Sequence, residues 1–335
     1  MKSKIKEAHL IDDLKSYYGH PSPEPHKDFY AIRDDIAICE IKDILLKGID
    51  VRVLDCCAGE GSVAKHISDT IASDELKRID YFAIDNDREC YSKLSNSSYL
   101  LERFKDFHPM LRMAHDLGDL KYGSFHLIFL LNAIHEISPV HLPKVLYCFN
   151  NLLSQDQGRF LLVDMEELPQ NQPEASAITW TSSEIGEILE SGGFPPSAVS
   201  HNKSSKVFVA KVFRQNDKPN IKSMLNTIIL LLENKLHLAR VMWKTIQCQK
   251  ITKEEMIISR VVFDGSVSKM YFELKNCQDA LCSMNYKHSN LNVSNRKASL
   301  LNHEVMSNQF LPRRNRKKSE FINTKDNYQL DRIAR

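Results

Sequence analysis

Short apolar runs alternate with amphipathic stretches along the first two thirds of the chain. The apolar runs have the length of buried strands, and an acid or a small residue follows several of them. They span residues 51–54, 79–84, 123–132, 158–164 and 206–213. Residues 28–47 and 180–194 instead repeat apolar side chains at helical spacing. Strands that alternate with helices predict an α/β fold built on a mostly parallel sheet.

The first apolar run ends in a turn of small residues, Asp55-Cys-Cys-Ala-Gly-Glu-Gly61. Its glycines let the backbone turn sharply and approach a ligand closely, and a helix is expected from Ser62. A strand, a glycine turn and a helix form a nucleotide-binding corner at the carboxyl edge of a parallel sheet. Two cofactor classes fit this corner. Residues 59–64 match the loose dinucleotide pattern G-x-G-x-x-A, and residues 55–61 read D-x-C-x-G-x-G.

The second pattern resembles motif I of the class I S-adenosylmethionine-dependent methyltransferases, with Cys57 in place of the first glycine. Asp85 ends the second strand as an acid does in that family. Asn132-Ala-Ile-His-Glu-Ile137 resembles the family's segment after the fourth strand. A dehydrogenase is not expected to carry such a segment. These matches favour S-adenosylmethionine over a dinucleotide.

The resemblance continues to a late helix, residues 180–194, which is similar to the family's helix ending in A-G-F but has Gly192 for the alanine. It covers about residues 27–214. It implies a Rossmann-like, seven-stranded, mostly parallel sheet with helices on both faces. The implied activity is methyl transfer from S-adenosyl-L-methionine.

The resemblance also implies how the cofactor is bound. Asp55 is expected near the methionine end, Asp85 at the ribose hydroxyls and Asp116 at the adenine amino group. A charged acceptor makes the ribose hydrogen bonds stronger than neutral ones. The expected cofactor-binding residues are Asp55, Cys57, Gly59, Gly61, Asp85, Asn86, Asp116, Leu117 and Asn132.

Methyl transfer from a sulfonium is a direct displacement, so the enzyme mainly aligns the acceptor with the methyl group. A base is needed only where the acceptor is protonated. His135 and Glu136 are the candidates, because they follow the fourth strand. The alternative for His135 is that it packs or orients without taking a proton. His126 lies inside a strand-like run, which favours a structural role.

The C-terminal third differs in charge from the rest. Residues 1–215 hold 24 basic and 32 acidic residues, a net of −8, whereas residues 216–335 hold 21 and 11, a net of +10. Helices are expected over 221–247, from 252 to Gly265, and over 266–282. The predicted divisions are a polar leader (1–26), the methyltransferase-like domain (27–215), a helical appendage (216–284) and a basic, low-complexity tail (285–335) that we expect to be disordered.

The methyl acceptor is not identified by the sequence, although a small molecule is favoured. One alternative is a nucleic-acid methyltransferase whose basic residues 216–335 bind phosphates. Another is a non-catalytic module that keeps the fold. The eight cysteines form no C-x-x-C pair or zinc-like cluster with histidine, so no metal site is predicted. A reducing, cytoplasmic setting and no membrane contact are expected, because no apolar run is long enough to cross a bilayer.

Overall fold

The computed structural model describes residues 26–284, except for 119, 122, 167–176, 196–198, 203–205 and 248–264. All described residues belong to one compact unit that spans residues 1–284. Residues 1–25 of the predicted polar leader, residues 252–264 of the helix expected to end at Gly265, and the basic tail lie outside the described residues. For those segments the sequence-based expectations stay predictions.

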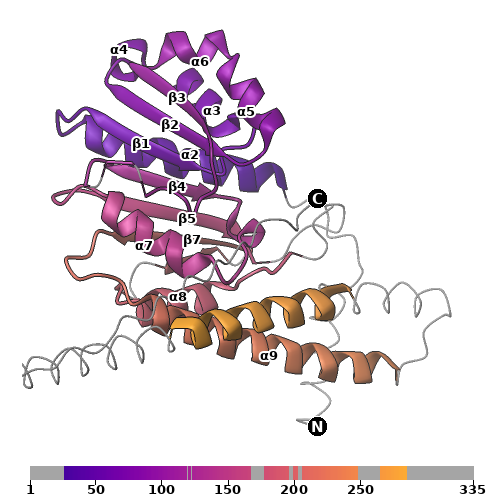
Figure 1. Ribbon diagram of the computed structural model, residues 1–335. Coiled ribbons are helices and arrows are strands. Elements are labelled where there is room, and N and C mark those ends of the chain that lie inside the picture. The colour runs from indigo at the N-terminus through magenta and orange to yellow at the C-terminus, as the bar shows by residue number, and fades with distance from the viewer. Residues whose placement is uncertain are drawn as a thin grey trace, which may run out of the picture. The chain divides into compact units, whose positions relative to one another are not determined.

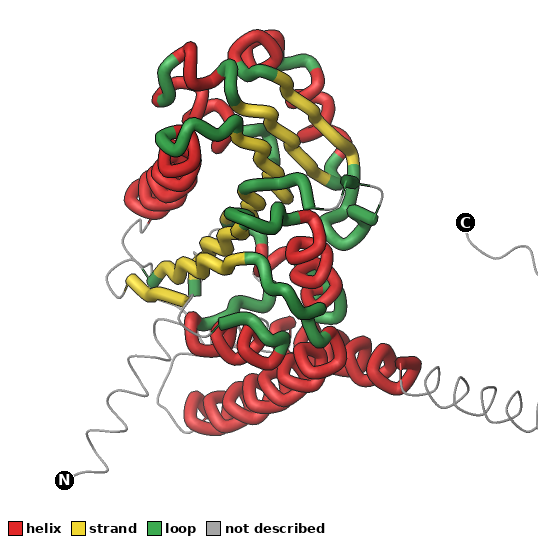
Figure 2. The backbone as a smooth tube through the Cα atoms, turned by 90° about the vertical axis from the view of Figure 1, so that its left-hand side faces the viewer, coloured by secondary structure: helices red, strands yellow, loops and turns green. Residues whose placement is uncertain are grey.

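A single twisted sheet forms the centre of the described chain (Figure 2). Its strand order is β3-β2-β1-β4-β5-β7-β6, and the five strands from β3 to β5 are parallel. β7 is antiparallel to both β5 and β6. The strands are β1 (Val51–Cys56), β2 (Ile79–Asp85), β3 (Asp106–Leu111), β4 (Leu127–Leu131), β5 (Arg159–Met165), β6 (Val199–Asn202) and β7 (Val207–Phe213). The parallel α/β sheet predicted from the sequence is therefore confirmed.

Helices follow most strands, as parallel connections require. They are α2 (His26–Leu45), α3 (Ser62–Thr70), α4 (Ser73–Leu76), α5 (Arg88–Ser95), α6 (Ser98–Arg103), α7 (Leu142–Leu152), α8 (Ser182–Ser191), α9 (Ile221–Gln247) and the short 3₁₀ turn η1 (Ile134–Glu136). Residues 265–284 form one more helix. The chain between β3 and β4 has no helix among its described residues.

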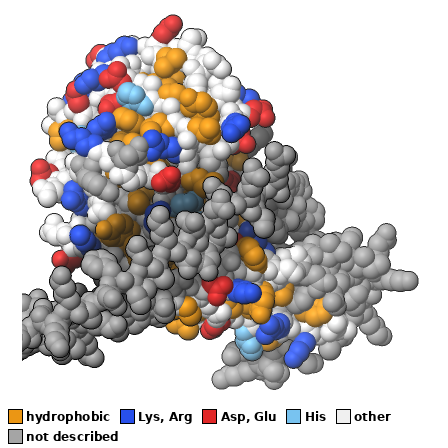
Figure 3. Space-filling model, viewed as in Figure 1, with side chains coloured by type: hydrophobic (Ala, Val, Ile, Leu, Met, Phe, Trp, Pro, Cys, Tyr) orange, Lys and Arg blue, Asp and Glu red, His pale blue; other side chains and the backbone are white. Residues whose placement is uncertain are grey.

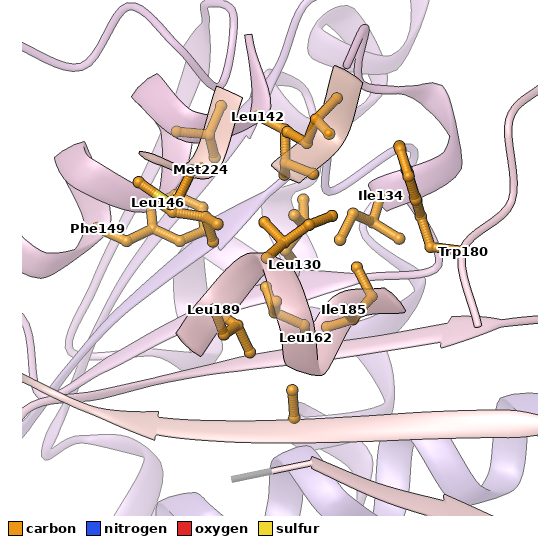
Figure 4. Close-up of a cluster of buried hydrophobic side chains, with 14 of the residues drawn as sticks. Leu130, Ile134, Leu142, Leu146, Phe149, Leu162, Trp180, Ile185, Leu189 and Met224 are labelled. Atoms are coloured by element: carbon orange, nitrogen blue, oxygen red, sulfur yellow. The ribbon is translucent and has the colours of Figure 1, made fainter. Parts of the chain in front are cut away.

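Successive side chains of a strand point to opposite faces of the sheet. The strands therefore contribute to two separate cores, one on each face. Helices α2, α3 and α6 pack on one face, against residues such as Val53 and Phe129. Helices α7, α8, α9 and 265–284 pack on the other, against residues such as Leu130 and Leu162. In Figure 4 side chains from β4, β5, α7 and α8 converge there with Trp180 and Met224. Helices on both faces, as predicted, are confirmed.

Two expectations need correction in detail. The fourth strand is shorter than the predicted run 123–132, because the chain makes only an isolated bridge at Phe125 before β4 begins at Leu127. The sequence pattern located neither β6 nor α7. β6 covers only four residues, which is too short for a clear pattern, whereas the buried residues of α7 repeat at helical spacing and could have been recognised. The predicted long helix 221–247 and the predicted helix 266–282 are confirmed within a few residues.

The helices after β7 are part of the main core. Met224, Ile228 and Leu232 of α9 are fully buried, and helix 265–284 lies alongside α9 in both ribbon and tube views (Figures 1 and 2). A Cβ at Gly192 would lie 2.7 Å from the sulfur of Met224. Close packing of α9 on the end of α8 therefore favours glycine at this position, where the methyltransferases that the sequence resembles have alanine. No described helix is both long and apolar enough to cross a membrane.

A buried arginine ties α2 to the sheet. Arg159 donates from Nε to Glu40 Oε2 at 2.5 Å and from Nη2 to Asp43 Oδ2 at 2.9 Å. We expect Arg159→Met to lower the free energy of unfolding by about 2 kcal/mol, because Glu40 then keeps only Lys211, 2.7 Å away, as an ionic partner in a half-buried site. Urea unfolding measures the change.

The control is Lys47→Met, which removes an exposed partner of the same Asp43. An exposed pair of this kind is worth about 0.5 kcal/mol or less. Equal effects of the two substitutions would contradict the anchoring role of Arg159.

Candidate functional site

The predicted site residues gather where the strand order reverses. β1 pairs with β2 on one side and with β4 on the other, so the chain leaves β1 and β4 in opposite directions. Open α/β sheets bind ligands at this switch point, outside the carboxyl ends of the strands. The glycine turn after β1, Asp85 at the end of β2 and Asn132 after β4 all lie at this edge.

The glycine turn is built from left-handed backbone. Gly59 and Gly61 have φ angles of +55° and +83°, and Cys57 shares this region at +59°. A Cβ at Gly61 would lie 2.6 Å from the Leu94 side chain, whereas a Cβ at Gly59 would meet nothing within 4 Å. The left-handed backbone at Gly61 favours glycine and a Cβ there would also displace Leu94, whereas Gly59 faces open space. Cys57 adopts a conformation that costs a non-glycine residue energy, so glycine would fit this position without strain.

Asp85 joins the turn to β2. Its Oδ2 accepts a hydrogen bond from the backbone N–H of Gly59 at 2.8 Å, and its Oδ1 accepts from that of Asp87 at 2.8 Å. Each carboxylate oxygen has two acceptor positions, so each retains one for a ligand. Asn86, the next residue, is exposed at the same corner.

Asp55 is buried beneath the turn. The hydroxyl of Tyr81 on β2 donates to its Oδ2 at 2.8 Å. Burial raises the pKa of Asp55 to about 7, against the lowering effects of Tyr81 and of the Arg33 charge. Negative charges on Asp34 and Asp85 raise this pKa further. The site therefore holds a carboxyl group that is ready to ionise near neutral pH when a positive charge approaches.

Arg33 of α2 reaches the same corner. Its Nε donates to Asp34 Oδ1 at 2.7 Å, and its Nη2 donates to Ser62 Oγ at 3.2 Å, at the first residue of α3. Its side chain lies over the ring of Tyr30, which is partly exposed. The segment before β1 is thereby fixed to the glycine turn.

The segment after β4 is held by the next strand. Asn132 has a φ of +58° and donates its backbone N–H to Val163 of β5 at 2.7 Å. His135 Nδ1 lies 2.9 and 3.0 Å from the two oxygens of Asp164, and the backbone N–H of His135 donates to Asp164 as well. A carboxylate only accepts hydrogen bonds. The hydrogen bond to Asp164 therefore places a proton on Nδ1 of the ring. Asp164 thus fixes the ring and its tautomer.

The charge around the turn is negative. The charges of Glu136, Asp85 and Asp55 all act on the thiol of Cys57, whose pKa is raised first by burial and then by each of them. Carboxylates from β1, β2 and η1 therefore converge on one residue of the turn. Glu136 is half exposed, and its Oε1 lies 3.9 Å from His135 Nε2. His135 itself is buried.

Not every predicted residue joins this cluster. Asp116 is exposed in the loop after β3, where its charge acts on His115 and on Cys148 of α7. Among the described contacts, none links Asp116 to the glycine turn. Leu117 is buried in the core of the α7 face. The adenine-side residues stay predictions.

His126 has the structural role that the sequence favoured. Its Nδ1 accepts from the backbone N–H of Arg52 on β1 at 3.0 Å, and burial lowers its pKa. Asp80, Asp106 and His108 form the one group of metal-like donors among the described residues, all within 4.8 Å. The carboxylate of Asp80 already pairs with Arg52 and His108. This group lies toward the amino ends of the strands, away from the turn.

Asp164 and Tyr81 are site residues that sequence reasoning missed. Asp164 follows an apolar run on β5, as Asp55 and Asp85 follow the runs of β1 and β2. An acid at the end of an apolar run is therefore the signal that could have identified it. Tyr81 lies inside a buried strand, and nothing in its local sequence distinguishes it from a core aromatic residue. Its contact with Asp55 depends on the register of β1 against β2.

Comparisons with known proteins give structural likeness only. No family model and no curated protein matches the chain. A methyltransferase from Aquifex aeolicus, titled as SAM dependent, superposes with a TM-score of 0.40 at 18% identity, over 58% of this chain and 100% of that one. The phosphoethanolamine N-methyltransferase 1 of Haemonchus contortus gives 0.43 at 12% identity, over 78% and 60%.

The CurJ carbon methyltransferase gives a TM-score of 0.40 at 14% identity, over 50% of this chain. The chain spans about half of that protein, 49% of its length. With TM-scores below 0.5, these likenesses assign neither a fold nor an activity to this chain. The function has to be inferred from the geometry of its own residues.

Burial of Asp55 predicts an unusual pH dependence of stability. Its pKa is about 7 in the folded chain and 3.8 ordinarily, so the folded state keeps a proton that the unfolded chain loses. This contribution to stability is complete below pH 4 and is lost as the pH rises through 7. We expect Asp55→Asn, which stays neutral, to be more stable than the wild type at pH 8 by on the order of 2 kcal/mol.

Urea unfolding at pH 5 and pH 8 checks this expectation, and the advantage of the variant should shrink at pH 5. Asp50→Asn is the matched control of opposite sign. Hydrogen bonds from Lys105 and Arg78 lower the pKa of Asp50, so its replacement should cost stability at pH 8. An Asp55→Asn variant that is less stable at both pH values would contradict the assignment.

Proposed function

We propose that this chain binds S-adenosylmethionine at the carboxyl ends of β1, β2 and β4 and is a methyltransferase for a small-molecule acceptor. The observation that carries the proposal is the convergence of Asp55, Asp85 and Glu136 on the glycine turn. Asp85 and Glu136, together with Asp55 once it ionises, favour a cation at this turn. S-adenosylmethionine carries a sulfonium and an ammonium group.

The same observation weighs against a dinucleotide. The N-terminus of α3 alone would suit a phosphate, because helix N-termini carry partial positive charge. A pyrophosphate would bring two negative charges beside the acids of the turn, and like charges at short range are repulsive. The sequence of the turn alone fits both cofactor classes, and the negative charge of the folded site supports S-adenosylmethionine.

Other features of the site fit the proposed cofactor. The side-chain oxygen of Asn132 is buried and has no hydrogen-bond partner among the described residues, so it is available to accept from an ammonium group. Asp85 retains acceptor positions that suit the ribose hydroxyls. The open space at Gly59 leaves room for a ligand against the backbone. Asp116 and Leu117 remain our candidates for the adenine side.

The bound cofactor would supply a methyl group already activated on sulfur. The chain then has to hold the acceptor in line and exclude water, which is where most of the rate gain arises. His135 and Glu136 are our candidates for removing a proton from the acceptor. Asp164 supports this role, because it accepts from Nδ1 and so fixes the orientation of the His135 ring beside Glu136.

A second candidate function is methylation of a nucleic acid. It rests on the net charge of +10 over residues 216–335. Fourteen of those 21 basic residues lie outside the described part of the chain, and on the face drawn in Figure 3 basic and acidic side chains are interspersed. A cut after Met284 tests this candidate, because α9 belongs to the core and must be retained. Loss of RNA or DNA binding on truncation would favour it.

Replacing the ribose-side acid should weaken cofactor binding. We expect Asp85→Asn to raise the Kd for S-adenosylmethionine by roughly 10- to 100-fold, because hydrogen bonds to a charged group are worth about 1.5–3 kcal/mol. Isothermal titration calorimetry measures it. Asp80→Asn, on the same strand but at its other end, is the matched control and should leave the Kd unchanged. Absence of binding to the wild type would refute the proposal.

Cofactor binding should also release protons. The pKa of Asp55 is about 7 in the free chain, and a bound cation lowers it, so affinity should rise as the pH increases from 6 to 8. Titrations at pH 6.5 in two buffers of different ionisation enthalpy count the protons released. In Asp55→Asn this release should disappear. Equal release from the variant and the wild type would show that another group is responsible.

A further inference from the structure

One buried carboxylate links the C-terminal helix to the catalytic segment. Glu273 lies on helix 265–284, and its Oε2 accepts a hydrogen bond from Ser138 Oγ at 2.6 Å. Ser138 follows η1 and is three residues beyond His135. The contact joins residues that are 135 positions apart in the chain.

Burial makes this carboxylate costly. Glu273 is 2% exposed, and its neighbours on the helix, Met270, Leu274 and Cys277, are buried in the apolar core. Its described ionic partner is Lys269, whose Nζ is 3.3 Å away and whose side chain is 41% exposed. Removing a carboxylate from water costs several kcal/mol before any pairing. An apolar side chain would suit the packing better, so the acid has a role that packing does not explain.

The segment from Asn132 to Ser138 is held at three points. The backbone of Asn132 bonds to β5, His135 bonds to Asp164 on β5, and Ser138 bonds to Glu273. Two of these anchors belong to the sheet, and the third belongs to the helix after it. Helix 265–284 therefore supplies one of the anchors of the segment that contains η1.

We propose that Glu273 is a positioning residue. It holds the Ser138 end of the segment that carries His135 and Glu136, and it makes helix 265–284 a structural part of the acceptor side of the site. The catalytic meaning of this coupling rests on the proposed function. The physical coupling of the helix to the segment does not.

Glu273→Leu separates positioning from packing. Replacing a buried charge with an apolar residue often leaves stability unchanged or raises it, so we expect a Tm no lower than that of the wild type. Hydrogen–deuterium exchange should nevertheless become about tenfold faster in peptides covering residues 132–141. Peptides from the glycine turn should not change. A role in packing alone would not loosen one segment of an equally stable protein.

Three further variants sharpen the test. Glu273→Gln keeps an oxygen that accepts from Ser138, so exchange should stay close to that of the wild type. Ser138→Ala removes the same bond from the other side and should reproduce the faster local exchange, even if Glu273→Leu fails to fold. Glu233→Leu is the control, because this exposed residue of α9 accepts a hydrogen bond from Gln278 of helix 265–284 and is not bonded to Ser138 among the described contacts.

The proposal is overturned if exchange over residues 132–141 is unchanged in both Glu273→Leu and Ser138→Ala. Titration of S-adenosylmethionine into the same wild-type protein keeps this result apart from the proposed function. A wild type that shows the coupling but binds no S-adenosylmethionine would refute the cofactor and leave the positioning of η1 established.

Discussion

The burial of Asp55 beneath the glycine turn is the constraint on which the site depends. A carboxyl group in an apolar layer resists ionisation, and the hydroxyl of Tyr81 only partly offsets the loss of water. The fold keeps this group where neutral packing would be more stable. Such a group gains most from a ligand that brings positive charge, which is why the electrostatics of the turn, more than its shape, indicate the class of cofactor.

The strand order of the sheet brings the residues of the site together at one edge. Parallel neighbours place the carboxyl ends of β1, β2 and β4 at one edge, and the reversal of direction at β1 leaves that edge open. Asp85 then fixes the turn through the N–H of Gly59, and Asp164 fixes the segment after β4 through His135. Each acid belongs to a different strand, so their convergence is a property of the topology.

Much of the fold was readable from the sequence, because buried strands and long amphipathic helices leave strong periodic patterns. The helix over residues 221–247 and the strand over 79–85 are examples. The glycine turn and the acids at strand ends could be predicted as well, because they directly follow these apolar runs in the sequence. Contacts made across the sheet were not. Tyr81 meets Asp55, and Glu273 meets Ser138, only after register and helix docking are set.

The helices after β7 change how the chain is divided. By charge and composition they look like an appendage, yet α9 fills the core on the α7 and α8 face, and its packing explains the glycine at residue 192. Through Glu273 the last described helix reaches the segment after β4. The described chain is better regarded as one unit whose final helices contact the segment after β4.

The most direct test of the central claim is to titrate S-adenosylmethionine and NAD⁺ side by side into the wild-type chain at pH 8. The acidic turn predicts saturable binding of S-adenosylmethionine and no measurable binding of NAD⁺. Binding of NAD⁺ in preference to S-adenosylmethionine would contradict the account, because the charge at the turn would then not select the cofactor.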